Sequence, residues 1–250
     1  MPRTRYKEIY RALKQQIETG VYPAQEMLPS ENVLTGAFGC SRGTLRRAVE
    51  ELVRAGYVQT IQGKGVRCIF EPAGQATFTL GTIETFAESA ARNHWHGTST
   101  VVCFRRLSAD AALARQTGFA EDTPLYYVCR LHALNGRTLI VNHSYFRRDV
   151  ARGLTADIAA HSIYRYLEQD LHVSIINSKR VVTVERATDL DLSYLDLDDC
   201  NCLAVVSSQT YNADGVMFEY TQSRHHPKFF RFQDNAVRRA PEPARSRNAG

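Results

Sequence analysis

The link between two helix patterns at Gly39 and Cys40 limits the fold more than any other feature of the sequence. Ser30 precedes a short amphipathic stretch that stops at Gly39, and Ser41 precedes a second stretch that stops at Gly56. Serine is a preferred N-cap residue, and glycine is favoured just after the end of a helix. Two helices with only two residues between them predict a helix-turn-helix unit.

The flanking segments complete this unit. Apolar residues over residues 6–19 recur at three- and four-residue spacing, which predicts a first helix that stops before Gly20. The β-prone stretches 58–61 and 66–70 are joined by residues 62–65, whose two glycines can adopt positive φ. The order helix, helix, helix, hairpin predicts a winged helix-turn-helix domain over residues 1–70.

The net charge of the chain lies in this same part. Residues 1–70 hold 11 Lys and Arg against 6 Asp and Glu, whereas residues 71–250 hold 20 of each, so the formal charge of +5 belongs to the first segment. A concentrated positive field on a small domain attracts a polyanion, and nucleic acid is the commonest one. Charge alone leaves a solvated surface without a partner as an equal alternative.

The third predicted helix is expected to enter the major groove of double-stranded DNA with its N-terminal end first. Short hydroxyl side chains there reach phosphates, and an arginine guanidinium can read guanine. Glycines in the hairpin turn allow the backbone to approach the sugar-phosphate chain closely. The predicted DNA-binding residues are Ser41, Arg42, Thr44, Arg46, Arg47, Gly63, Lys64 and Gly65. A surface helix with a solvated arginine face is the alternative.

The first 70 residues resemble a known family. Their ordered motifs are Tyr22-Pro23-Ala24, Leu28-Pro29-Ser30-Glu31, Ser41-Arg42-x-Thr44-Leu45-Arg46-x-Ala48, Gly56-Tyr57 and Gln62-Gly63-Lys64-Gly65. This pattern resembles the DNA-reading head of GntR-type bacterial transcription regulators. The resemblance implies that Arg42, Thr44 and Arg46 touch DNA and that Gly63 belongs to the wing tip. Asn32 departs from an arginine of that pattern, and Gly43 lies inside the reading helix at a cost in helix propensity of about 1 kcal/mol relative to alanine.

The rest of the chain predicts a second, larger domain. Residues 71–77 break both strand and helix patterns and indicate a linker, residues 78–238 form the domain, and residues 239–250 suggest a disordered tail. Turn signals at Asn135-Gly136 and Ala213-Asp214-Gly215 favour antiparallel pairing, so the fold class is α+β. Strands are predicted over residues 99–107, 125–134, 138–146, 173–186, 203–211 and 216–223, and helices over 84–93, 109–117, 156–171 with a break near His161, and 188–195.

This second domain resembles the UTRA effector domain of HutC-like GntR regulators. The resemblance rests on Arg130-x-His132, Gly153-Leu154-Thr155, Ser162-Ile163-Tyr164-x-Tyr166-Leu167-Glu168 and Glu219-Tyr220-Thr221-x-Ser223-Arg224. Within that branch, Leu80-Gly81-x-Ile83-Glu84-x-Phe86, Val182-Thr183-Val184-Glu185 and Arg231-Phe232-x-Asp234 are most similar to trehalose operon repressors. The resemblance implies a chorismate-lyase-like fold, a homodimer and a small-molecule inducer. A dimer of heads would read an inverted-repeat operator.

A phosphorylated sugar, with trehalose 6-phosphate as first candidate, is the expected effector. Ser162 can cap a helix whose free amides face a phosphate, and Arg130 can add a guanidinium. Tyr164 offers a hydroxyl, and His132 lies on the strand face of Arg130 as a pH-dependent donor. Glu219 and Arg224 are predicted partners for sugar hydroxyls, with a salt bridge between them as an equal alternative. A carboxylate such as urocanate is the alternative effector.

Other classes of function are disfavoured. No apolar run is long enough to span a membrane, and the N-terminus lacks a signal core, so we expect a cytoplasmic protein. Six scattered cysteines predict reduced thiols, with Cys200 and Cys202 on one side of a strand. The pairs His94/His96 and His225/His226 lack the spacing of a zinc site. No phosphate loop or nucleophile motif indicates an enzyme, and no cofactor is expected.

Overall fold

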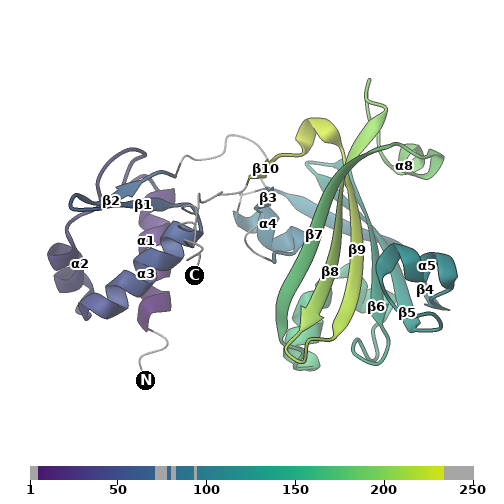
Figure 1. Cartoon of the computed structure of the whole chain (residues 1–250). Coiled ribbons are helices and arrows are strands. Elements are labelled where there is room, and N and C mark those ends of the chain that lie inside the picture. The colour runs from purple at the N-terminus through teal and green to yellow at the C-terminus, as the bar shows by residue number, and fades with distance from the viewer. Residues whose placement is uncertain (1–4, 71–77, 80–82, 93–94, 234–250) are drawn as a thin grey trace, which may run out of the picture. The chain divides into compact units, whose positions relative to one another are not determined.

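The computed structural model describes residues 5–70, 78–79, 83–92 and 95–233 (Figure 1). These fall into two compact units, the first holding residues 5–70 and Gln233 and the second holding the described residues from 78 to 232. The predicted linker at 71–77 and the predicted tail at 239–250 lie outside the described residues. Among the described helices, none is long and apolar enough to cross a membrane.

The first unit contains the three predicted helices. They are α1 (Arg5–Glu18), α2 (Glu31–Phe38) and α3 (Arg42–Arg54). The Ser41 hydroxyl accepts a hydrogen bond from the Thr44 amide at 3.2 Å, and Gly39 ends α2 in the left-handed conformation with φ of 55°. One face of each helix is buried, and these faces supply most of the core of the first unit. Their core residues are Ile9, Leu13, Ile17, Leu34, Leu45, Ala48 and Leu52. The capping and spacing signals of the sequence therefore place the helices correctly.

The predicted hairpin follows α3. Strands β1 (Val58–Ile61) and β2 (Gly65–Cys68) pair antiparallel, with Val58 opposite Cys68. Gly63 and Gly65 adopt φ of 72° and 114°, which an L side chain rarely accepts. Both ends of the hairpin are buried in the core of the first unit, so the turn projects away from it.

The second unit is built on a six-stranded antiparallel sheet in the order β4-β5-β6-β9-β8-β7. Its strands are β4 (Gly97–Ser108), β5 (Pro124–Leu134), β6 (Arg137–Arg147), β7 (Ile175–Arg186), β8 (Cys202–Asn212) and β9 (Met217–His225). Asn135 and Gly136, both at positive φ, make the turn between β5 and β6. Each predicted strand is present, with ends shifted by at most two residues, which confirms the α+β class. Two short strands, β3 (Phe78–Thr79) and β10 (Phe232–Gln233), pair with each other.

Helices cover both faces of this sheet. The face that bears Tyr126, Val128 and Phe218 packs against α6 (Ala156–Ala160), α7 (Ile163–Arg165) and the π-helical turn Tyr166–Asp170. The predicted break near His161 separates α6 from α7. The opposite face packs against the segment that contains α8 (Asp189–Tyr194), and α5 (Ala111–Thr117) lies beside Leu125 and Tyr220 on that face. Helix α4 (Phe86–Arg92) lies on the other side of the sheet from α8 (Figure 1).

Candidate functional site

Two arginines on the exposed face of α3 are oriented by the start of α2. Arg42 donates from Nη2 to Oδ1 of Asn32 at 3.0 Å, and Arg46 donates from Nε to Oε2 of Glu31 at 3.1 Å. Both arginine side chains are 67% exposed, so a polyanion can reach them. Asn32, which departs from the family pattern, therefore serves as the partner of Arg42. Arg42 and Arg46 of α3, together with Glu31 and Asn32 of α2, therefore form one polar surface across the two helices.

The remaining predicted DNA residues lie around that surface and in the wing. The Ser41 and Thr44 hydroxyls are 2.9 Å apart at the start of α3. Arg47 stacks its guanidinium over the Tyr6 ring of α1, with 4.2 Å to the ring centroid. Lys64 is exposed between the two positive-φ glycines of the turn. Arg47 thus differs from Arg42 and Arg46, because α1 holds it rather than α2.

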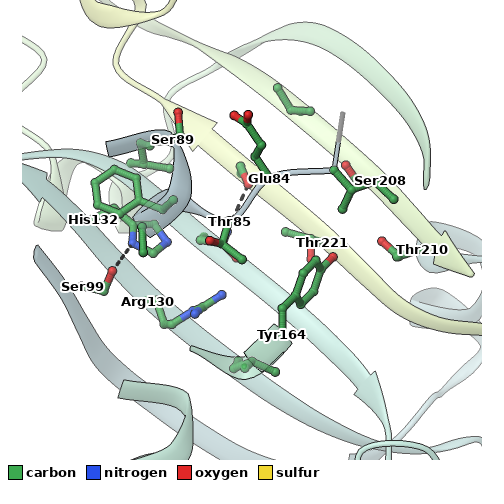
Figure 2. Close-up of a pocket in the computed structure, with 18 of the residues that line it drawn as sticks. Glu84, Thr85, Ser89, Ser99, Arg130, His132, Tyr164, Ser208, Thr210 and Thr221 are labelled. Atoms are coloured by element: carbon green, nitrogen blue, oxygen red, sulfur yellow. Dashed lines mark hydrogen bonds between the residues drawn. The ribbon is translucent and has the colours of Figure 1, made fainter. Parts of the chain in front are cut away.

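A cavity opens in the second unit between the sheet and the helices α4 and α7 (Figure 2). Hydroxyl side chains line it from four strands, namely Ser99, Ser178, Ser208, Thr210, Thr221 and Ser223. Apolar walls come from Ile83, Phe86, Ile140, Ile163, Val206 and Phe232. Five of the six predicted effector residues reach it: Arg130, His132, Ser162, Tyr164 and Glu219. A set of many hydroxyls between apolar walls suits a polar ligand with several hydroxyl groups.

Arg130 points into this cavity from β5, as Figure 2 shows. Its Nε atom is buried without a hydrogen-bond partner, and within the described residues its guanidinium forms no ion pair. Burial lowers the pKa of Arg130, and the neighbouring Glu219 carboxylate opposes this shift. A buried donor without a partner costs free energy, and a bound anion would satisfy it.

Arg180 also lines the cavity, although it is not among the effector residues predicted from the sequence. It lies on β7 two residues after Ser178, so both side chains face the same side of the strand. Arg180 is half-buried, and the described part of the chain offers it no hydrogen bond or ion pair. The only signal in the sequence was this alternation. Two guanidinium groups from separate strands therefore face one cavity.

The buried Glu219 carboxylate accepts hydrogen bonds from two side chains that line the cavity. Tyr164 donates its hydroxyl to Oε2 of Glu219 at 2.5 Å, and Thr221 donates to Oε1 at 2.8 Å. Burial raises the pKa of Glu219, and these two hydrogen bonds oppose the shift. Burial raises the pKa of Tyr164, and the negative charge of Glu219 is the second-largest cause of this shift. The phenol therefore keeps its proton. This pair fixes the Tyr164 ring at the edge of the cavity.

His132 is held as a neutral side chain. Its Nδ1 lies 2.7 Å from the Ser99 hydroxyl, and its ring stacks on Phe86 with 4.4 Å between centroids. Burial lowers its pKa well below the ordinary value, and the charges of Arg130 and His225 lower it further. The Ser99 and Phe86 contacts fix the His132 ring, and the direction of its pKa shift argues against our expectation of a pH-dependent donor.

Arg224 does not reach the cavity, which corrects the sequence prediction. It lies five residues after Glu219 on β9, on the opposite face of the sheet. Its guanidinium donates to both carboxylate oxygens of Asp191, at 2.7 and 3.0 Å, and to Glu185 at 2.6 Å. The alternative of a salt bridge between Arg224 and Glu219 is wrong for the same reason. Arg224 ties β9 to α8 and β7.

The remaining sequence candidates do not form a site in the described residues. His225 lines the cavity, whereas His226 lies near Arg137 and Asp198. Cys202 begins β8, but Cys200 lies in the preceding turn, so the two cysteines do not share one strand. His94 lies outside the described residues, and within them no three metal-ligating side chains cluster.

Comparison with known proteins identifies both units. Residues 5–68 match the model of bacterial regulatory proteins of the gntR family, and residues 94–231 match the UTRA domain. The transcriptional regulator TreR of Bacillus subtilis is 34% identical over 92% of this chain and 96% of its own. The mannosyl-D-glycerate system repressor MngR of Escherichia coli is 23% identical over 94% of this chain and 97% of its own. These relatives are named as regulators, which confirms the prediction of a regulator rather than an enzyme.

Solved structures agree in fold. The possible regulator YydK of B. subtilis superposes with a TM-score of 0.78 at 21% identity, over 93% of this chain and 99% of that one. The effector-binding domain of the B. subtilis trehalose repressor superposes with a TM-score of 0.52 at 31% identity. This superposition covers 57% of this chain and 99% of that domain.

Proposed function

The chain belongs to the gntR family of bacterial transcription regulators and carries a UTRA domain, and from this we infer how it reads DNA and what releases it. We propose a homodimeric repressor on an inverted-repeat operator of a sugar-utilisation operon. A phosphorylated sugar, trehalose 6-phosphate being the first candidate, binds the cavity and releases the operator. The observation that carries the effector proposal is the buried, unpartnered Nε of Arg130 in a hydroxyl-lined cavity.

The N-terminal end of α3 supplies the base-reading groups. Arg42 and Arg46 read bases in the major groove, while the Ser41 and Thr44 hydroxyls bind phosphates. Arg47, held against Tyr6, contacts the backbone at the edge of this surface. In the wing, Lys64 neutralises a phosphate, and Gly63 and Gly65 keep the turn free of side chains that would block its approach.

The edge strand β7 supports the homodimer. It lies at the end of the sheet order, and its Val181, Val182 and Val184 side chains are 52%, 41% and 75% exposed. Soluble proteins seldom leave a long apolar edge strand uncovered, because it pairs with other chains. The exposed Leu190 and Leu192 of α8 follow it in the chain. A second copy of the chain covers this edge.

The cavity suits a sugar phosphate better than an uncharged sugar. Arg130 and Arg180 provide cationic donors from β5 and β7, and a guanidinium binds phosphate oxygens bidentately. Ser162 begins the helical segment, and the amides of Ile163 and Tyr164 add donors at its start. Glu219 and the strand hydroxyls accept or donate to sugar hydroxyls. The relative named a trehalose repressor makes trehalose 6-phosphate the first sugar to test.

Calorimetry with the full chain tests the effector. Trehalose 6-phosphate should bind at least about tenfold more tightly than trehalose, a difference of about 1.4 kcal/mol. Arg130→Ala should remove most of that difference, whereas Arg115→Ala, at an exposed position of α5, should keep it. Equal binding of both sugars, or tighter binding of urocanate, would reject the phosphate and favour the carboxylate alternative.

Titration of duplex DNA tests the reading surface. The operator is first selected from a random duplex library, and binding should weaken steeply with salt. Arg42→Ala and Arg46→Ala should each cost about 1 to 3 kcal/mol and relax specificity, while Lys64→Ala should weaken all sequences alike. Salt-independent binding, or a double variant that binds as well as the parent, would contradict the assignment.

A further inference from the structure

Two cysteines face each other across the first pair of strands in the sheet. Cys103 of β4 and Cys129 of β5 are direct partners in the antiparallel register, so their side chains lie on the same face. Both are free thiols, with Cys129 buried and Cys103 half-buried. They lie on the face opposite the cavity, away from the proposed effector contacts. Neither thiol is among the residues proposed to bind DNA or the effector.

The surroundings of the two thiols differ in a way that assigns them different roles. Arg105 donates from Nε to Sγ of Cys103 at 3.1 Å, so a cationic donor lies beside this half-buried sulfur. Burial raises the pKa of Cys129, and the hydroxyl of Tyr127 partly opposes this. Cys103, which is the more exposed thiol and lies beside Arg105, is therefore the nucleophile, and the buried Cys129 is the thiol held next to it.

The backbone at this point allows the sulfur atoms to approach. Directly opposed residues have Cβ atoms about 4.5 to 5.5 Å apart, whereas a disulfide needs about 3.5 to 4.5 Å. The register shifts between Val101 and Cys103, which places one extra residue, Val102, in β4 beside the thiol. β4 also lies at the free edge of the sheet, so it can move without breaking pairing on its outer side.

We propose that Cys103 is an oxidation site for hydroperoxides and that Cys129 resolves it into a cross-strand disulfide. The Cys103 thiolate attacks one oxygen of the hydroperoxide, the O–O bond breaks, and the alkoxide or hydroxide leaves with the electron pair and takes a proton from solvent. Cys129 sulfur then attacks the sulfenic acid, the S–S bond forms, the S–O bond breaks, and the departing oxygen takes the Cys129 proton to form water. One hydroperoxide is reduced and two thiols are oxidised.

Peptide mapping of the full chain after treatment with hydrogen peroxide tests the site. Trypsin cleaves after Arg105 and after Arg130, so each cysteine falls in its own peptide. We expect a linked Cys103–Cys129 peptide, a protein mass lower by two hydrogen atoms, and reversal by dithiothreitol. In Cys129→Ser, Cys103 should instead be trapped by dimedone as the sulfenic acid, without the linked peptide.

A matched pair of variants tests the role of Arg105. Arg105→Gln should slow peroxide oxidation of Cys103 by about twofold or more, because the Cys103 sulfur loses the cationic donor beside it. Arg106→Gln removes the same charge from the next residue, which instead stacks over Tyr126 on the other face of the sheet, and should leave the rate unchanged. Linkage of Cys200 to Cys202 instead, or oxidation of Cys103 no faster than that of Cys40, would overturn the proposal.

Discussion

Arg46 on α3 donates a hydrogen bond from Nε to the Glu31 carboxylate of α2 at 3.1 Å. The same carboxylate lies 3.9 Å from Nε of Arg42, so one acid holds two proposed base-reading groups. Because both arginine side chains are 67% exposed and the Glu31 side chain is 35% exposed, the pairs contribute little to stability, at most about 1 kcal/mol each. The pairs instead orient the two arginine side chains and reduce the positive charge of the surface proposed to bind DNA.

Replacement of this acid should change specificity more than stability. In Glu31→Gln, we expect tighter binding to scrambled duplex DNA, because a negative charge is lost beside the reading surface, and a smaller ratio of operator to scrambled affinity. Fluorescence anisotropy at fixed salt measures both. Glu50→Gln removes the same charge from an exposed site on α3 and is the control. An unchanged ratio in Glu31→Gln would show that the acid does not orient the arginines.

The hydrogen bond from Tyr164 to Glu219 should stabilise the second unit. Tyr164→Phe leaves a buried carboxylate without one of its donors, which should cost about 1 to 3 kcal/mol in the free energy of unfolding. Tyr166→Phe removes a hydroxyl that donates to the Arg152 carbonyl and should cost less. Urea unfolding measures both, and equal costs would contradict a special role for the buried acceptor.

The Arg224 network should affect stability without affecting the ligand. Asp191 is 1% exposed and Arg224 is 6% exposed, so Arg224→Ala leaves a buried carboxylate unpaired and should cost about 3 to 5 kcal/mol. Arg137→Ala, which breaks a more exposed pair with Asp198, should cost about 1 kcal/mol or less. By calorimetry, the folded fraction of Arg224→Ala should bind the effector with the parent's affinity. A large loss of affinity in this variant would show that Arg224 belongs to the binding site.

Stability should fall in mild acid because of His225. Burial lowers its pKa to about 3, below the unfolded value of about 6.5, so the unfolded chain binds a proton first as the pH drops. The stability present above pH 6.5 is therefore lost progressively towards pH 3. Between pH 7.5 and 5.5, His225→Asn should lose about 1.4 kcal/mol less than the parent in urea unfolding. The exposed His172→Asn should keep the parental pH dependence, and an identical slope in His225→Asn would refute the prediction.

Two glycines of the first unit should respond to alanine in opposite ways. Gly43 lies in α3 with open space where a Cβ would sit, so Gly43→Ala should stabilise by up to about 1 kcal/mol. Gly63 adopts φ of 72°, where alanine is strained, so Gly63→Ala should destabilise by about 1 to 2 kcal/mol. Thermal unfolding of both variants measures the difference, and equal signs would contradict it.

Local signals were enough to place most elements of this chain. Ser30, Ser41 and Gly39 fix helix ends through hydrogen bonds within a few residues, and Asn135-Gly136 fixes a hairpin through its own φ angles. Strand alternation alone placed Arg130 and His132 on one face. The same rule failed for Arg224, because the predicted strand stopped at residue 223 whereas β9 continues to His225. Because β9 continues through Arg224, that side chain and Glu219, five positions earlier, face opposite sides of the sheet.

The sequence by itself determined the two-part organisation, the helix ends, the hairpins and the faces of single strands, because each depends on contacts between near neighbours in the chain. Only the tertiary structure decided which strands are adjacent. The order β4-β5-β6-β9-β8-β7 brings Arg180 of β7 to the cavity of Arg130, and it sends Arg224 to Asp191. The residues of each pair are 33 or more positions apart, and their placement depends on the pairing of the whole sheet, which no local pattern encodes.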